Sequence, residues 1–217
     1  MGRTLFGNQA GGGRRLAAWL APLLVLALWA AEAKAQSTVL VSNIGQSAVE
    51  TRGLDALDFA QKFTTGATVA GYTLTGVDLR LVAFTAADTD SAAPRVRVVR
   101  GAATGGSSVA VATLTAGTTT IPVGTGDNYA FTAPANTTLL PSTDYWIVVE
   151  AASSGGGDVI VFATNADSED TTSAAGWSID DGTLTRAHDS TGAFTEGTIA
   201  FLIRVNGSSV NTPATGA

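Results

Sequence analysis

The sequence predicts an all-β protein, an antiparallel β-sandwich preceded by an N-terminal signal peptide helix. Two observations predict the fold class: short runs alternate apolar and polar residues with a period of two, and clusters of Gly, Asn, Asp and Ser separate these runs. A third is that helical periodicity is almost absent after residue 35. Because each sheet then has one apolar face to cover, two sheets are expected to pack face to face.

Residues 1–35 have the layout of a secretory signal peptide. Three arginines precede an apolar run at residues 16–31, and the tripeptide "AKA" precedes an expected cleavage site before Gln36. The alternative is a retained membrane anchor. The run is shorter than the roughly 20 apolar residues that a membrane span needs, and Pro22 interrupts it, so a cleaved leader is favoured.

The chain after the leader is acidic and contains no cysteine. Four of the 12 basic residues and one of the 18 acidic residues precede Gln36, so the net charge of the remainder is −9. A negative surface repels phosphate backbones and anionic lipid, so neither nucleic acid nor a membrane surface is an expected partner. Without cysteine, the core holds the fold, with or without bound ions, and cysteine-based redox chemistry is excluded.

The clearest strand lies at residues 73–84. Val77, Leu79 and Leu81 fall on one face, whereas the charged Asp78 falls on the other, as expected for a sheet with one solvated side.

The same alternation predicts strands at residues 95–100, 109–114, 144–151 and 198–207, and the run at residues 158–164, which is apolar on both faces, predicts a central strand. In the third of these, Glu150 shares an outward face with Trp146 and Val148. Residues 53–63 are predicted as either a single helical turn or an irregular loop.

These strands define one β-sandwich domain at residues 36–207. Turn residues separate them and no helices intervene, so we predict a jelly-roll-like topology of about eight or more strands, with an immunoglobulin-like sandwich as the alternative. Residues 208–217 are small and polar and include Pro213, which is the composition of a linker. This tail predicts that the domain is one module of a longer protein.

Several segments together resemble the choice-of-anchor R domain, a module of bacterial surface proteins. They are "VSNIGQ", "AQKFTTGATVAGYTLTGVDLRL", "YAFTAPANTTLLPSTDYWIVVEA", "GWSIDDGTL" and "FLIRVNG", in this order across the chain after the leader. The resemblance implies a secreted or wall-attached protein in which the domain lies beside other modules. It implies no catalytic residues.

No motif in the sequence is specific enough to predict a catalytic activity. His188, the only histidine, stands beside Asp189 and Ser190, but neighbours on an extended chain point to opposite sides, whereas a triad needs convergent geometry. One histidine without cysteine cannot supply the usual zinc ligands. A glycosidase needs two carboxylates facing each other across a groove, whereas Asp78 and Glu150 are expected on outward faces. The protein is therefore predicted not to be an enzyme.

The acidic loops are candidates for calcium. Oxygen ligands at close spacing in loops are what Ca²⁺ prefers, and two clusters offer them. The candidate ligands are Asp167, Glu169, Asp170, Asp180 and Asp181. None fits a complete EF-hand loop, and the alternative is an acidic, solvated loop.

Two aromatic residues are candidates for sugar binding. Trp177, and with it Tyr72, would form the rim of a ligand site if the indole were exposed beside the acidic loop. The alternative is that both rings belong to the core, where aromatic side chains bury most area.

The sequence therefore predicts a non-enzymatic, secreted or cell-surface module with a structural or adhesive role. Its expected partners are extracellular or surface components, such as polysaccharide or neighbouring modules. A carbohydrate-binding module, with or without calcium, is the main alternative, and a secreted glycoside hydrolase is a weaker one.

Overall fold

The computed structural model of the protein describes residues 38–54, 57–83, 91–103, 108–124, 126–151, 159–165, 169–187 and 195–210. The predicted signal peptide and residues 211–217 of the predicted linker lie outside this part. Within it no helix is long and apolar enough to span a membrane. The strands are β1 (Thr38–Ser42), β2 (Glu50–Gly53), β3 (Leu57–Thr64), β4 (Tyr72–Ala83), β5 (Ser91–Ala92), β6 (Arg95–Gly101), β7 (Ser108–Ala116), β8 (Thr120–Ile121), β9 (Asp127–Thr132), β10 (Thr138–Leu139), β11 (Asp144–Glu150), β12 (Val159–Thr164), β13 (Ser178–Ala187), β14 (Thr195–Glu196), β15 (Ala200–Phe201) and β16 (Ile203–Ser209).

Most of these strands belong to one continuous sheet. Its order is β1-β16-β4-β9-β7-β6-β11-β3-β13-β14, with β10 and β12 also paired to β4, and with β2 and β15 paired to β12. β5 and β8 form a separate two-stranded sheet. The pairings between these strands are antiparallel. The predicted all-β antiparallel fold is therefore confirmed.

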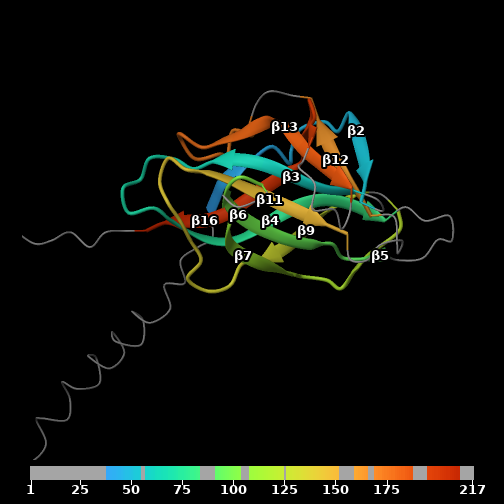
Figure 1. Ribbon diagram of the computed structural model, residues 1–217, viewed down its shortest axis with the longest axis horizontal. Helices are drawn as coiled ribbons and strands as arrows, with labels where there is room; N and C mark the ends of the chain where they lie inside the picture. Colours follow the sequence, from blue (N-terminus) through green and yellow to red (C-terminus); the bar gives the residue numbers. More distant parts are fainter. Residues whose placement is uncertain are drawn as a thin grey trace, which may run out of the picture. The chain divides into compact units, whose positions relative to one another are not determined.

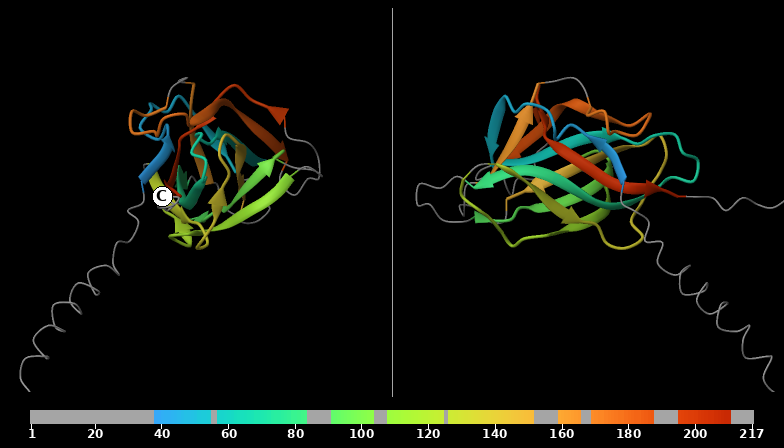
Figure 2. Two further views of the ribbon diagram at one scale, coloured as in Figure 1. Left: turned by 90° about the vertical axis from the view of Figure 1, so that its left-hand side faces the viewer. Right: turned by 180° about the vertical axis from the view of Figure 1, so that it is seen from behind.

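β7 connects the two halves of this sheet. It pairs with β6 along most of its length, and its last residues, Thr115 and Ala116, pair with Thr132 and Phe131 of β9. The sheet consequently curls around its own core into a nearly closed, barrel-like wall, which the left view of Figure 2 shows end on. In Figure 1, β13, β12 and β2 lie at the top and β7 and β9 at the bottom.

The core follows the predicted alternation. Val77, Leu79 and Leu81 of β4 are fully buried in the main hydrophobic cluster, whereas Asp78 on the opposite face is half-buried. On β6 and β11 the outward residues Val99 and Val148 are also buried, in a small second cluster with Ala60 and Ala103. The sheet is therefore buried on its inner face and, around β11, also on part of its outer face.

The prediction for residues 53–63 is wrong. Instead of a helical turn or loop, this segment contains β3, a central strand between β11 and β13. Phe59 and Phe63 point into the core, and Gln61 lies between them on the same face. Because the inward-facing Gln61 is polar, this segment lacks the apolar alternation of a strand, and its sequence resembles a loop.

Candidate functional site

The candidate site lies along β1, where residues 170–174 bond to the outer edge of the sheet. This junction is called the seam. β1 ends the sheet path, but the chain segment 170–174 covers its outer edge. The Asp170 N–H donates to the Ser42 carbonyl at 2.6 Å, and the Ala174 N–H donates to the Leu40 carbonyl at 2.8 Å. The Ser42 N–H donates to Ser173 Oγ at 3.0 Å. An edge strand that would otherwise expose unpaired backbone groups is thereby closed.

The Asp170 carboxylate fixes this seam. Its Oδ2 accepts a hydrogen bond from Ser42 Oγ at 2.6 Å and another from the Gly45 N–H at 3.1 Å. A Cβ at position 45 would lie only 3.0 Å from Asp170 Oδ1, so glycine allows the loop to approach the carboxylate this closely. The segment "VSNIGQ" therefore supplies the hydrogen-bond donors to the Asp170 carboxylate.

The other candidate calcium ligands have different partners. Glu169 Oε1 accepts the Ile179 N–H at 2.8 Å. Asp180 pairs with Lys62 and accepts the Gly182 N–H at 3.1 Å. Burial raises the pKa of Asp180, but the hydrogen bonds from Lys62 and Gly182 outweigh burial and hold that pKa below its usual range.

These carboxylates do not form a metal site with one another. In the described ranges no three His, Cys, Asp or Glu side chains come together to hold a metal ion. Glu169, Asp170 and Asp180 instead bind backbone, hydroxyl and ammonium groups of the protein, and Asp181 also has a partner within the protein. Asp167 lies outside the described residues, so the calcium hypothesis stays a prediction there.

Two buried side-chain amides, those of Asn43 and Gln61, lie beside the seam. Asn43 Nδ2 donates to the Phe201 carbonyl at 2.9 Å, and Asn43 Oδ1 accepts the Ile203 N–H at 2.7 Å. Gln61 Oε1 accepts the Phe201 N–H at 2.9 Å, and Gln61 Nε2 donates to the Asp180 carbonyl at 2.7 Å. Both backbone groups of Phe201, where β15 ends, are therefore satisfied by side-chain amides, as buried backbone requires.

An aromatic stack fills the core next to these amides. Phe63 stacks on Tyr145 at 5.6 Å between ring centroids and on Trp177 at 6.0 Å, and Tyr72 meets the Trp177 ring edge-on at 4.7 Å. Trp177 and Tyr72 are only 6% and 4% exposed. Both rings therefore belong to the core, the alternative given above, and neighbouring rings cover Trp177.

The indole N–H of Trp177 has no hydrogen-bond acceptor in the part of the chain that the structure describes. It lies against Gly66, since a Cβ there would be 3.0 Å from Nε1. Trp146, by comparison, donates its indole N–H to the Gly101 carbonyl at 2.8 Å. A buried donor without an acceptor loses about 1–3 kcal/mol of hydration that nothing replaces.

Two hollows open along the seam and share Val39 and Thr172. The first, of about 450 Å³, is lined by Thr38, Val39, Leu40, Thr68, Tyr72, Thr172, Ala174, Ala175, Trp177 and Ser209. The second, of about 830 Å³, is lined by Val39, Ser42, Ile44, Gly45, Gln46, Glu169, Asp170, Thr171, Thr172 and Arg204. The first has no charged lining residue among those described, whereas the second has three.

Glu150 is on the predicted outward face but is only 5% exposed. Its Oε2 accepts Arg95 Nε at 2.6 Å and its Oε1 accepts Arg97 Nη2 at 2.5 Å. Burial raises the pKa of Glu150, but the hydrogen bonds and charges of Arg97 and Arg95 outweigh it, so the pKa lies below its ordinary value. A solvated outward carboxylate was expected here, and the two arginines explain the difference.

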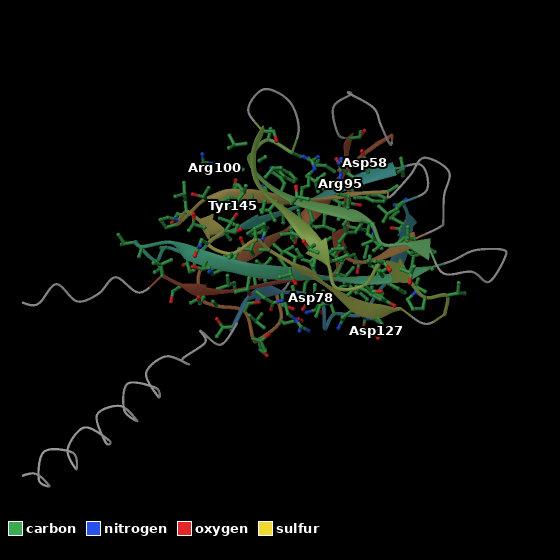
Figure 3. All side chains as sticks on the ribbon, turned by 90° about the horizontal axis from the view of Figure 1, so that it is seen from below. Asp58, Asp78, Arg95, Arg100, Asp127 and Tyr145 are labelled. Atoms are coloured by element: carbon green, nitrogen blue, oxygen red, sulfur yellow. The ribbon has the colours of Figure 1, made fainter. Side chains whose placement is uncertain are left out.

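Asp78 and Glu150, the two strand carboxylates considered for catalysis, are not close to each other. Asp78 accepts Asn206 Nδ2 at 3.1 Å and lies 3.4 Å from Arg204 Nη1. Figure 3 shows Asp78 and Arg95, the partner of Glu150, on opposite sides of the β-sheet domain. The two strand carboxylates therefore do not face each other across a cleft. His188 lies outside the described residues.

Sequence reasoning missed the most constrained polar residues, Asn43, Gln61 and the acceptor role of Asp170. A signal did exist, because Asn43 and Gln61 interrupt apolar runs at positions that the alternation directs inward. No family model and no curated protein matches the chain.

Proposed function

We propose that the protein is a non-enzymatic module that acts outside the cell, or at its surface, in a structural or adhesive role. The observation that carries this proposal is the commitment of its polar groups to the fold. Asp170 holds the seam, Glu150 is bound by two arginines, and the amides of Asn43 and Gln61 satisfy the break at Phe201. A sheet stabilised by such hydrogen bonds and ion pairs needs no disulfide bonds, and these polar side chains serve the fold and not a reaction.

The adjacency of the first and last described strands supports a module attached on one side. β1 and β16 are antiparallel neighbours, with Thr38 opposite Gly207. The start of β1 and the end of β16 therefore lie at the same end of the sheet. The curled sheet fits a jelly-roll-like sandwich, and the immunoglobulin-like arrangement is the alternative. The expected partners are surface polysaccharide or neighbouring modules.

Expression of the full chain in a secreting bacterial host tests this proposal. We expect an exported protein whose N-terminus, by mass spectrometry, is Gln36. We also expect it to release no reducing ends from polysaccharides during prolonged incubation. An intact leader on a cytoplasmic protein would contradict the proposed location, and steady release of reducing ends would contradict the non-enzymatic role.

A further inference from the structure

We propose that the uncharged hollow beside Trp177 binds a neutral sugar unit of a glycan chain, and that the indole N–H is the donor to this ligand. The inference deepens the proposed adhesive role and rests on it. It is drawn from the lining of the hollow, the orphaned donor and the glycine beside it.

The lining of the hollow fits an uncharged ligand rich in hydroxyl groups. Thr68, Thr172 and Ser209 contribute hydroxyls that make no side-chain hydrogen bond in the described part of the chain. A hydroxyl both donates and accepts, so such a wall can match sugar hydroxyls in either role. Because no carboxylate, ammonium or guanidinium lines the hollow among the described residues, it offers no opposite charge to compensate the desolvation of a charged ligand.

The size of the hollow is also appropriate. About 450 Å³ lies within the roughly 300–1,000 Å³ of ordinary small-molecule sites. It shares the lining residues Val39 and Thr172 with the larger hollow, so the two hollows are neighbours.

The Trp177 N–H is the feature that packing alone does not explain. Trp146 shows that this fold can give an indole an acceptor, yet Trp177, which is more deeply buried, has none among the described residues. An incoming ring or hydroxyl oxygen would restore the missing hydrogen bond. A ligand that does so gains affinity from a penalty that the free protein already carries.

Gly66 lies against the indole N–H of Trp177 and covers it. A Cβ at position 66 would lie 2.5 Å from Tyr72 Oη and 3.0 Å from Trp177 Nε1, so the loop can rest against the indole only because it has glycine there. Tyr72 Oη also accepts the Thr68 N–H at 3.1 Å, which holds the loop down. We expect the ligand to replace this contact as it reaches the indole, with residues 67–69, which are exposed, moving outward.

The indole signals in a ¹H–¹⁵N spectrum test the proposal directly. The exported protein is titrated with neutral oligosaccharides (cellohexaose, mannohexaose, xylohexaose and maltohexaose) and with an oligogalacturonate as the charged comparator. The Trp177 signal, assigned with a Trp177→Phe variant, should move downfield and saturate with at least one neutral sugar, whereas the Trp146 signal should stay in place. The charged sugar should leave both unchanged.

Two variants make the test specific. Thr172→Val removes a lining hydroxyl at constant shape and should weaken binding about 3- to 10-fold, the usual effect of one neutral hydrogen bond. Thr113→Val removes an exposed hydroxyl on β7, outside the hollow, and should leave the affinity unchanged. Calorimetry should also show a similar loss for Trp177→Phe.

The outcomes separate this inference from the proposed function. Absence of a shift at Trp177 with every neutral sugar, preference for the charged sugar, or equal weakening by both threonine variants would overturn the sugar site while leaving a non-enzymatic exported module intact. Release of reducing ends during the titration would instead overturn the non-enzymatic role itself.

Discussion

The amide of Asn43 and the indole of Trp177 are both buried polar groups beside the seam, and their hydrogen bonding differs completely. Asn43 uses its carbonyl and its amino group to satisfy two backbone groups near Phe201, whereas the Trp177 N–H has no acceptor in the described chain. The first arrangement stabilises the folded state. The second costs stability, and it lies beside a hollow. Two buried polar groups beside the seam thus have opposite effects on the stability of the fold.

Replacing Asn43 should have the largest effect. Asn43→Leu leaves the Ile203 N–H and the Phe201 carbonyl buried without partners, and each such group costs about 1–3 kcal/mol. We expect a total loss of about 2–5 kcal/mol in the free energy of unfolding, measured by urea titration. The control is Asn128→Leu on the exposed side of β9, which should change it by less than about 0.5 kcal/mol. Equal losses in both variants would contradict the role of the buried amide.

Glu150→Gln should have the next largest effect. It removes a carboxylate that accepts hydrogen bonds from Arg95 and Arg97, and hydrogen bonds to charged groups contribute about 1.5–3 kcal/mol each. Because Arg95 is largely exposed, we expect a loss at the lower end, about 1–3 kcal/mol at pH 7. Glu50→Gln, which breaks the exposed pair with Arg52, should cost less than about 1 kcal/mol.

The pH dependence of this loss has a definite sign. The pKa of Glu150 is lower in the folded than in the unfolded protein, so its contribution is fully present above the unfolded pKa, about 4.3. The contribution disappears as the pH falls through the lower, folded pKa. Stability of the wild type and of Glu150→Gln should therefore converge in acid. A difference that stays constant into strong acid would show that the charge of Glu150 is not the cause.

Asp170→Asn tests the seam and should have a moderate effect. The variant loses the charge that accepts Ser42 Oγ and the Gly45 N–H, so we expect a loss of about 1–2 kcal/mol and faster hydrogen exchange at the Gly45 amide. Asp144→Asn is matched, because Asp144 also accepts a hydroxyl, from Thr64 at 2.7 Å, but in an exposed setting. If Gly45 exchanged at the wild-type rate in Asp170→Asn, the carboxylate would not be what closes the seam.

The sequence predicted those features that repeat along a strand. Val77, Leu79 and Leu81 share a face, as do Val96 and Val98, and all of them lie in the core. Period-two alternation depends on the backbone alone, so it survives any tertiary arrangement. It failed at β3, because Gln61 occupies an inward position where its amide is satisfied mainly by distant backbone groups, including those of Phe201 and Asp180.

The candidate site was less predictable for the same reason. The sequence proposed Asp170 as a calcium ligand, which stays a prediction, and it did not indicate the partners that the structure gives this carboxylate, Ser42 and Gly45, more than 100 residues away in the chain. Trp177 and Tyr72 line one hollow, and both are buried by contacts within an aromatic stack that includes Phe63. Contacts between segments this far apart are set by topology, which local periodicity does not specify.

Trp177→Phe should have the smallest effect on stability, and it sharpens the comparison with Asn43 most directly. Phenylalanine keeps the aromatic contacts with Phe63 and Tyr72 but removes the N–H that has no acceptor. Loss of packing volume is then offset by relief of an unsatisfied donor, so the free energy of unfolding should fall by no more than about 1 kcal/mol. Trp146→Phe is the control, because it removes an indole that is hydrogen-bonded to Gly101. If Trp177→Phe destabilised the protein as much as Asn43→Leu, and more than Trp146→Phe, relief of an unsatisfied donor would not be offsetting the lost packing, and the distinction between a bonded and an unbonded polar group at the seam would no longer hold.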